Sequence, residues 1–359
     1  MAKIVSVYNK NSDFLPLDMS YIRWLKIAEA LANRGHQVDI ATMEKIPSES
    51  PVEMAPNLRR ISLFNVRWSD YDVVKTVFHR GFETLEAMGG TGHPFIISKL
   101  GSVVSSEDRE GIYFYGQTRA DLYATQEKIQ RTSRYITLLS PPAIDLWKQL
   151  FQSNGNLLMV PGAADREIPG HNGDPFPKRD GIRCLFAGNI YTLDRQPEAN
   201  HVLVSKLNDL GRILKADGIQ LYMMGPGDIS QLNLEVVHYL GAVPFQQTWD
   251  YFRSSDVGIV VSAGKFQHNN ESSKIYHYLR AGLPVVSESG FPNDFLIYES
   301  KLGFLVESGN MALMAERIAE AARTNWDRDF AIQYILKHHT WESRVLIYDQ
   351  LIRKEFHSH

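Results

Sequence analysis

Two kinds of hydrophobic pattern alternate near the start of the chain. The apolar run from Ile4 to Tyr8 predicts a buried strand. Between Leu17 and Leu31, apolar side chains instead recur every three or four residues, which is the spacing of an amphipathic helix, and Gly35 is suited to end it. The segment 38–42, which follows Gly35 and contains Val38, Ile40 and Ala41, is expected to be the next strand. A strand, a helix and a strand in this order form a βαβ unit, which favours a parallel sheet covered by helices.

The alternation of strands and helices continues along the chain with one interruption. In the first half we expect strands at 60–64, 72–78, 94–98, 135–140 and 157–160, and helices near 119–130 and 142–152. In the second half we expect strands at 182–187, 220–224, 257–262 and 284–287, and helices at 198–217, 249–254, 272–281 and 311–323. The predicted fold class is therefore α/β, in two halves of similar size.

The interruption is the segment 169–180, where three prolines and two glycines fall within twelve positions. This composition is typical of a linker. We therefore predict an N-terminal domain at 1–168, a linker at 169–180, a C-terminal domain at 181–340 and a last helix within 341–359. Two α/β domains joined by one linker are typical of a cleft enzyme or of a two-lobed binding protein.

Charge and cysteine content narrow the classes of function. The net charge is −3, so the basic excess of a nucleic-acid-binding surface is missing. The single cysteine, Cys184, lies in an apolar run, which excludes a disulfide framework and favours a reducing compartment. The apolar stretch at the N-terminus is too short for a signal peptide, and no window has the ~20 apolar residues of a membrane span. We expect a cytoplasmic protein.

The most informative segment for chemistry opens the predicted helix at 272–281. Polar residues at Asn269 and Glu271 precede Ser272, Ser273 and Lys274. Backbone N–H groups and the positive end of the helix dipole are available at such a start, and Lys274 adds a full charge. This combination suits a diphosphate; on the residues alone, a capping serine and a solvated lysine are an equal alternative.

The same segment resembles the signature of family 4 and related glycosyltransferases of the GT-B fold. The residues that fit this signature are Lys274, Tyr278, Ala281, Gly282 and the run from Pro284 to Val286. The resemblance implies that the diphosphate of a nucleotide-sugar donor binds at the helix start. The family holds the donor with two glutamates; His277 and Asn269 stand at their positions here. We expect His277 to bind a ribose hydroxyl and Glu271 to supply a carboxylate.

Weaker motifs extend the resemblance over nearly the whole chain, apart from residues 45–115. They are the segments at 32–38, 160–165, 185–189, 223–227, 240–244 and 341–356. The resemblance implies two Rossmann-like lobes facing a cleft, with the last helix crossing back to the N-terminal lobe.

Several residues near the ends of the predicted strands are further candidates for donor binding. Gly188 and Asn189 follow a strand, where a glycine lets a ligand approach the backbone closely. By resemblance, Arg195 holds the donor phosphates, and Val243 and Phe245 lie near the base. The alternatives are a solvated arginine and a core aromatic residue. Gly225 is a further candidate, with a tight turn as the alternative that we prefer.

The N-terminal half is expected to hold the acceptor. His79 follows the apolar run that we assign to a strand ending at 78, and by resemblance it is a catalytic candidate; a structural histidine is the alternative. Asp18 lies in the loop before the first helix and can take a proton from an acceptor hydroxyl; capping the helix is its alternative role.

The sequence carries no His, Cys or Asp pattern for a metal, and no glycine-rich dinucleotide motif or Walker loop. We therefore expect a metal-independent, cofactor-free glycosyltransferase that moves a sugar from a UDP- or GDP-sugar to an acceptor hydroxyl. The acceptor can be a carbohydrate, a lipid-linked sugar or a small molecule, and a lipid-linked acceptor would bring the protein to the inner face of the membrane. The alternatives are a nucleotide-sugar epimerase of the same fold and a non-catalytic nucleotide-sugar-binding partner subunit.

Overall fold

The computed structural model describes residues 1–11, 19–44, 51–105, 112–114, 117–153, 155–177, 181–264 and 269–357. The chain forms two compact units. We call residues 1–111, 117–162 and 341–359 the first unit, and residues 112–116 and 163–340 the second unit. The second unit begins its main part at Ala163, directly after Gly162, so the proline-rich segment 169–180 belongs to the second unit.

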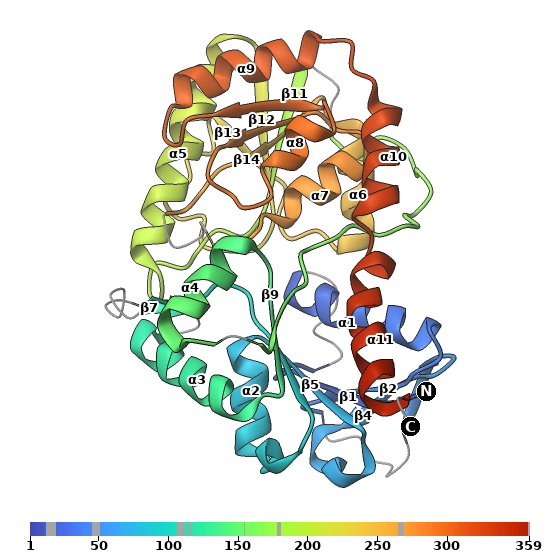
Figure 1. The fold of residues 1–359 in the computed structure, drawn as a ribbon. Coiled ribbons are helices and arrows are strands. Elements are labelled where there is room, and N and C mark those ends of the chain that lie inside the picture. Colours follow the sequence, from blue (N-terminus) through green and yellow to red (C-terminus); the bar gives the residue numbers. More distant parts are fainter. Residues whose placement is uncertain are drawn as a thin grey trace. The chain divides into compact units, whose positions relative to one another are not determined.

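The first unit is built on a sheet in the order β10-β9-β6-β5-β1-β2-β4-β3 (Figure 1). All its pairings are parallel except that of β3 with β4. The strands are β1 (Lys3–Val7), β2 (Gln37–Thr42), β3 (Val52–Ala55), β4 (Leu58–Ser62), β5 (Val73–Val77), β6 (Ile96–Lys99), β9 (Tyr135–Leu138) and β10 (Leu157–Met159). The helices are α1 (Met19–Asn33), α2 (Phe78–Ala87), α3 (Arg119–Thr132), α4 (Pro141–Phe151) and α11 (Trp341–His357). The short strand β8 (Gln117–Thr118) precedes α3, and the short strand β7 (Ile112–Phe114) just before it in the chain is counted with the second unit.

The central strands of this sheet are almost entirely buried because both of their faces are covered. Every residue of β5 is buried, including Lys75 and Thr76. This burial is typical of parallel strands between two helix layers, and it explains why the sequence shows no regular alternation of apolar and polar residues here.

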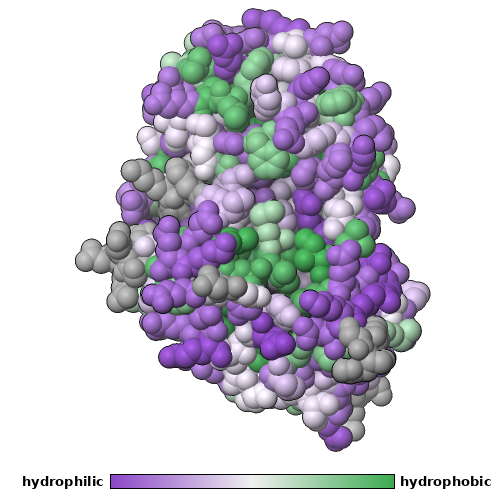
Figure 2. Space-filling view, in the orientation of Figure 1, coloured by the Kyte–Doolittle hydropathy of each residue, from purple (hydrophilic) through white to green (hydrophobic). Residues whose placement is uncertain are grey.

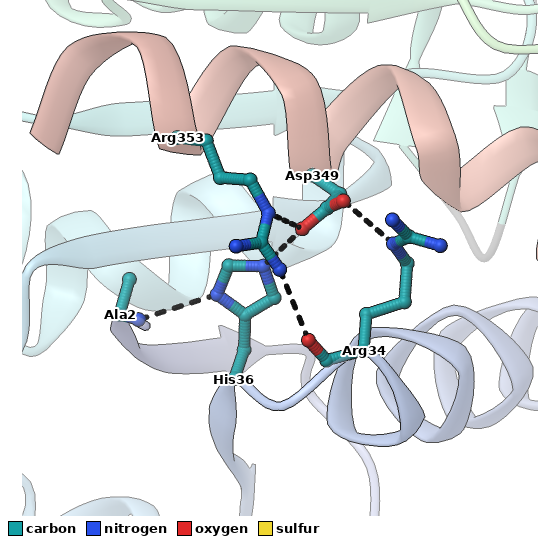
Figure 3. A network of polar contacts seen from close by, with 5 residues as sticks. All are labelled: Ala2, Arg34, His36, Asp349 and Arg353. Atoms are coloured by element: carbon teal, nitrogen blue, oxygen red, sulfur yellow. Dashed lines mark hydrogen bonds and ion pairs between the residues drawn. The ribbon is translucent and has the colours of Figure 1, made fainter. Parts of the chain in front are cut away.

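A buried polar network fixes α11 against the start of β2 within the first unit (Figure 3). Asp349 of α11 accepts hydrogen bonds from Arg34 (2.6 Å), His36 (2.9 Å) and Arg353 (2.7 Å). The other ring nitrogen of His36, Nδ1, accepts from the backbone N–H of Ala2, so the imidazole is held as the neutral Nε2–H form. The Arg-Gly-His motif of the sequence therefore anchors the last helix.

The second unit is built on an entirely parallel sheet in the order β13-β12-β11-β14-β15-β16. The strands are β11 (Ile182–Ala187), β12 (Ile219–Met224), β13 (Val237–Tyr239), β14 (Val257–Val260), β15 (Val285–Glu288) and β16 (Gly303–Val306). The helices are α5 (Pro197–Ala216), α6 (Phe245–Ser254), α7 (Ser273–Arg280), α8 (Phe295–Glu299), α9 (Met311–Arg323) and α10 (Arg328–His338).

Helices cover both faces of this second sheet. Val257 and Ile259 of β14 belong to the core that α5 and α9 complete. Gly258 lies between them in sequence and faces the other way, where a Cβ atom would come within 2.6 Å of the Tyr278 ring on α7. The glycine therefore makes room for α7 against the sheet. Cys184 lies in β11 and is fully buried, as its apolar surroundings predicted.

The predicted elements were largely confirmed, with one clear error. The run at 72–78 is not one strand, because β5 ends at Val77 and Phe78 opens α2 with a left-handed backbone (φ 59°). His79 therefore lies in the first turn of a helix. Several short elements were missed: β3, β7, β8, β13, β16, α2, α8 and α10, along with single 3-10 turns at Leu63–Asn65, Trp68–Asp70 and Gly90–Gly92. Most of them have too few residues to show a period.

None of the described helices has the length and apolarity to span a membrane. Figure 2 shows hydrophilic side chains over much of the visible face, with apolar residues in smaller groups.

Candidate functional site

The carboxyl ends of the strands in the second unit meet at one edge of the parallel sheet, where ligands bind in open α/β folds. Backbone hydrogen bonds hold the loops there side by side. The N–H of Gly188 donates to Met224 O (2.8 Å), and that of Gly225 donates to Gly241 O (2.9 Å). The loops after β11, β12 and β13 therefore form one continuous backbone surface.

Glycines make this close approach of the loops possible. Gly225 has φ 142°, and a Cβ atom there would lie 2.2 Å from the carbonyl oxygen of Gly188. Gly227 has φ 141° and would place a Cβ atom 2.0 Å from Ile190 O. No other residue type fits either position, so Gly225 does more than form a tight turn.

Lys274 lies across the end of β11. A Cβ atom on residue 188 would come within 2.6 Å of Lys274 Cε and 2.9 Å of Nζ. The ammonium also lies 5.0 Å from the centroid of the Phe186 ring. Desolvation lowers the pKa of Lys274 to about 8, because burial disfavours the charged ammonium. An anionic ligand beside the ammonium would stabilise this charged form. Two residues that sequence analysis proposed independently, Gly188 and Lys274, are thus brought into contact.

The start of α7 is fixed by a residue that sequence analysis missed. The fully buried amide of Asn293 accepts from Ser272 N (2.9 Å) and donates to Ser272 O (2.9 Å). Because the two residues lie 21 positions apart, no local pattern could have revealed the contact. We call these two hydrogen bonds the Asn293 clamp. They fix the backbone of Ser272 and so the direction in which the chain enters α7.

Ser272 is the N-cap residue of α7, yet its hydroxyl does not cap the helix. Within the described part of the chain, Ser272 Oγ has no hydrogen-bond partner and is shielded from solvent; the residue is only 7% exposed. A buried hydroxyl of this kind is normally bonded. Ser272 Oγ and the Lys274 ammonium are therefore two polar groups near one helix start that suit an anion.

Three other residues proposed for donor binding lie next to or near Ser272 in the sequence, and they differ in burial. Glu271 is buried and accepts a hydrogen bond from the Tyr276 hydroxyl (2.8 Å). Asn269 and Ser273 are half-buried.

His277 is buried in an aromatic cluster. Its ring lies edge-on to Phe245 (centroids 5.3 Å apart) and to Trp249 (5.6 Å). Phe245 opens α6 and is itself buried, and Val243 just before it is half-buried. The structure thus brings Phe245 and His277 together, as side chains packed against one another.

Two other donor-binding candidates are exposed. Arg195 is 53% exposed and lies 3.6 Å from Asp194 in the same loop, and Asn189 is also exposed. Asp18 lies outside the described residues. Among the described residues no three His, Cys, Asp or Glu side chains gather as a metal site would require.

A buried ion pair also supports this edge of the sheet. Glu288, at the end of β15, is fully buried and accepts from the backbone N–H groups of Ser262 (2.6 Å) and Gly309 (2.7 Å). Lys206 of α5 donates to the same carboxylate at 2.8 Å. Glu288 therefore holds together the loops that follow β14 and β16.

In the first unit, His79 lies in the first turn of α2, directly after the carboxyl end of β5, and is 7% exposed. Its Nε2 lies 3.2 Å from Gln126 Oε1 on α3. The prediction of a histidine at the end of a strand was wrong in its element, because the left-handed Phe78 starts the helix one residue earlier. His79 nevertheless stays at the carboxyl edge of the sheet.

Comparison with known proteins agrees with this description. Residues 204–323 match the family model described as the C-terminal domain of glucosyltransferase 3-like proteins. No curated protein sequence matches the chain significantly.

Solved structures resemble the chain over its whole length. Sucrose-phosphate synthase from Thermosynechococcus elongatus is 15% identical with a TM-score of 0.72, and 100% of both chains is covered. WaaG, a glycosyltransferase of lipopolysaccharide biosynthesis, is 14% identical with a TM-score of 0.64, covering 98% of this chain and 99% of that one. Anabaena HepE in complex with UDP-glucose is 13% identical with a TM-score of 0.67, and 100% of both chains is covered. The fold is thus that of the GT-B glycosyltransferases, and the resemblance predicted from the sequence is confirmed.

Proposed function

We propose that the chain is a glycosyltransferase that moves a sugar from a nucleotide-diphosphate sugar to an acceptor hydroxyl without a metal ion. The matched family model is that of a glucosyltransferase-like domain, and it spans the residues at the start of α7. HepE, which has the same fold, was crystallised with UDP-glucose, which favours UDP over GDP in the donor.

The observation that carries the proposal is the convergence of three features on one point. The Lys274 ammonium lies across Gly188, the Ser272 hydroxyl is buried without a described partner, and the start of α7 adds its dipole. In the proposed site the diphosphate accepts hydrogen bonds from the ammonium and the hydroxyl, and the helix dipole stabilises its negative charge. The same groups stabilise the negative charge that develops on the diphosphate when the bond to the sugar breaks.

The direct test is titration of UDP, GDP and their sugars into the wild-type protein and a Lys274→Ala variant, followed by calorimetry. We expect the variant to bind UDP at least tenfold more weakly, the equivalent of about 1.4 kcal/mol. Lys215→Ala is the matched control, because Lys215 is an exposed lysine of the same unit that lies on α5. Equal UDP binding by the wild-type protein and Lys274→Ala would refute the site.

Turnover assays separate the three functions that the sequence allows. A glycosyltransferase releases UDP from UDP-glucose only when a carbohydrate, lipid-linked or small-molecule acceptor is present. An epimerase converts its nucleotide sugar with no acceptor. A non-catalytic partner subunit binds UDP but turns over no donor with any acceptor, and this last outcome would refute the proposed activity while leaving the binding site intact.

A further inference from the structure

The orientation of the Gln126 side chain in the first unit is fixed by a single residue, Val104. Gln126 Oε1 accepts from Val104 N (2.8 Å), and its Nε2 donates to Val104 O (3.0 Å). Gln126 is fully buried. A reversed amide would set an NH₂ group against an N–H and an oxygen against a carbonyl, so the two bonds identify which end is oxygen.

This orientation determines the protonation of His79. Gln126 Oε1 lies 3.2 Å from His79 Nε2, and a carbonyl oxygen can only accept a hydrogen bond. Nε2 must therefore carry the hydrogen atom. In a neutral imidazole the other nitrogen, Nδ1, is then the acceptor.

The surroundings of His79 favour the neutral ring. Burial lowers the pKa of His79, and the bond to Gln126 and the charge of Glu83 oppose only part of the shift. The Glu83 carboxylate is itself engaged, since it accepts hydrogen bonds from Gln117 (2.8 Å) and Thr125 (3.0 Å).

We infer that Gln126 is a positioning residue that holds His79 as the Nε2–H tautomer, so that Nδ1 accepts a hydrogen bond from a substrate hydroxyl. A charged imidazolium would instead donate to a phosphate. An accepting Nδ1 at this edge of the first sheet therefore suits the hydroxyl of a sugar rather than a phosphate. The identity of that hydroxyl, as one of the transferred sugar or its acceptor, rests on the proposed glycosyltransferase function.

The tautomer can be measured independently of any activity. In protein labelled with ¹⁵N-histidine, the His79 signals are assigned by their loss in His79→Gln, and two-bond ¹⁵N–¹H correlations distinguish the two tautomers. We expect a neutral Nε2–H ring at pH 7 in the wild-type protein. A charged ring or the Nδ1–H tautomer would overturn the inference.

Variants of Gln126 test its role. Gln126→Met removes the acceptor, and we expect a mixture of tautomers. Gln126→Glu keeps an oxygen acceptor, so Nε2–H is retained while the carboxylate raises the pKa of His79. The matched control is Gln130→Met on the same helix, because Gln130 accepts from Trp147 and not from His79. If Gln126→Met gave the wild-type tautomer spectrum, Gln126 would have no positioning role.

Kinetics link the tautomer to substrate recognition. We expect Gln126→Met to lower kcat/KM for transfer roughly tenfold, the effect of one hydrogen bond, with UDP affinity and the activity of Gln130→Met unchanged. Wild-type transfer by both His79→Gln and Gln126→Met would refute the assigned contact. Loss of UDP binding in Lys274→Ala is a separate result, so failure of the donor site and failure of this inference are distinguishable.

Discussion

The side chain of Lys274 passes so close to Gly188 that a β-carbon at position 188 would displace the end of the lysine. The Cα atom of residue 188 follows the central strand β11, and a Cβ atom there would lie 2.6 Å from Lys274 Cε. Contact between a strand end and a helix start brings a cation to the carboxyl edge of the sheet, where the helix dipole is also positive. The fit between these two residues leads directly to the first prediction.

Gly188→Ala is expected to weaken UDP binding by about tenfold, because the new methyl group forces the Lys274 ammonium away from its position. Gly188 has no positive φ, so backbone strain does not contribute. The measurement is calorimetric titration of UDP. The matched control is Gly170→Ala in the same unit, where a Cβ atom meets nothing within 4 Å. Unchanged UDP affinity in Gly188→Ala would show that the contact has no role in binding.

The lowered pKa of Lys274 predicts a dependence of donor affinity on pH. Desolvation sets this pKa at about 8, so the free protein loses the ammonium as the pH rises through 8. We expect UDP affinity to fall between pH 7 and pH 9. In Lys274→Arg the guanidinium stays charged, so the affinity of that variant should change little over the same range. Parallel pH profiles for the two proteins would contradict the prediction.

Local sequence patterns predicted the exact bounds of some elements but failed at the boundary between β5 and α2, for a physical reason. The strand Ile182–Ala187 and the helix Met311–Arg323 have the predicted bounds because each is set by its own periodicity. The end of β5 at Val77 does not follow from such a local pattern, because the apolar run continues through Phe78. Phe78 has a left-handed backbone, and its ring lies 6.0 Å from that of Tyr8. A Cβ atom on Gly101 would come within 3.1 Å of the same ring. Both neighbours are far from Phe78 in the sequence.

The same distinction holds in the candidate site. Lys274 and Gly188 could be proposed from the sequence because a helix start and a strand end have local signatures. The Asn293 clamp on Ser272, and the contact of Gln126 with His79, join residues far apart in the chain. Such contacts depend on how the elements pack, and a single sequence does not specify them.

Asn293→Asp tests whether the entry to α7 must be held rigidly. The carboxylate can still accept from Ser272 N, but it cannot donate to Ser272 O, and it adds negative charge near the proposed diphosphate site. We expect UDP affinity to fall about tenfold or more and the unfolding free energy to fall by about 1–3 kcal/mol. Calorimetry and denaturant unfolding measure the two effects. A variant that is less stable but binds UDP normally would show that the clamp supports only the fold.

The network around Asp349 predicts how stability depends on pH. Burial opposes ionisation of Asp349, but hydrogen bonds from His36, Arg34 and Arg353 outweigh it and lower its pKa. Burial likewise lowers the pKa of His36, despite the neighbouring carboxylate. For both groups the unfolded chain binds more protons than the folded chain at acid pH. Stability is therefore fully present near pH 7, and the His36 contribution is lost as the pH falls below 6.5, followed by that of Asp349 below its ordinary value of 3.8.

Asp349→Ala removes the shared acceptor and leaves His36 and two arginine side chains without their carboxylate. We expect a loss of about 1–3 kcal/mol in the unfolding free energy at pH 7, because the fully buried His36 loses its acceptor, whereas the Arg34 and Arg353 side chains, 40% and 47% exposed, stay in contact with water. The slope of stability between pH 7 and pH 5 should persist through His36, whose ring stays buried. Chemical denaturation at several pH values provides the measurement, and the surface pair Arg212 and Asp209, disrupted by Asp209→Ala, provides the control. Equal stability of Asp349→Ala and the wild-type protein at pH 7 would show that the other contacts of α11, such as the hydrogen bonds of Tyr348 and Glu355, suffice to hold it in the first unit.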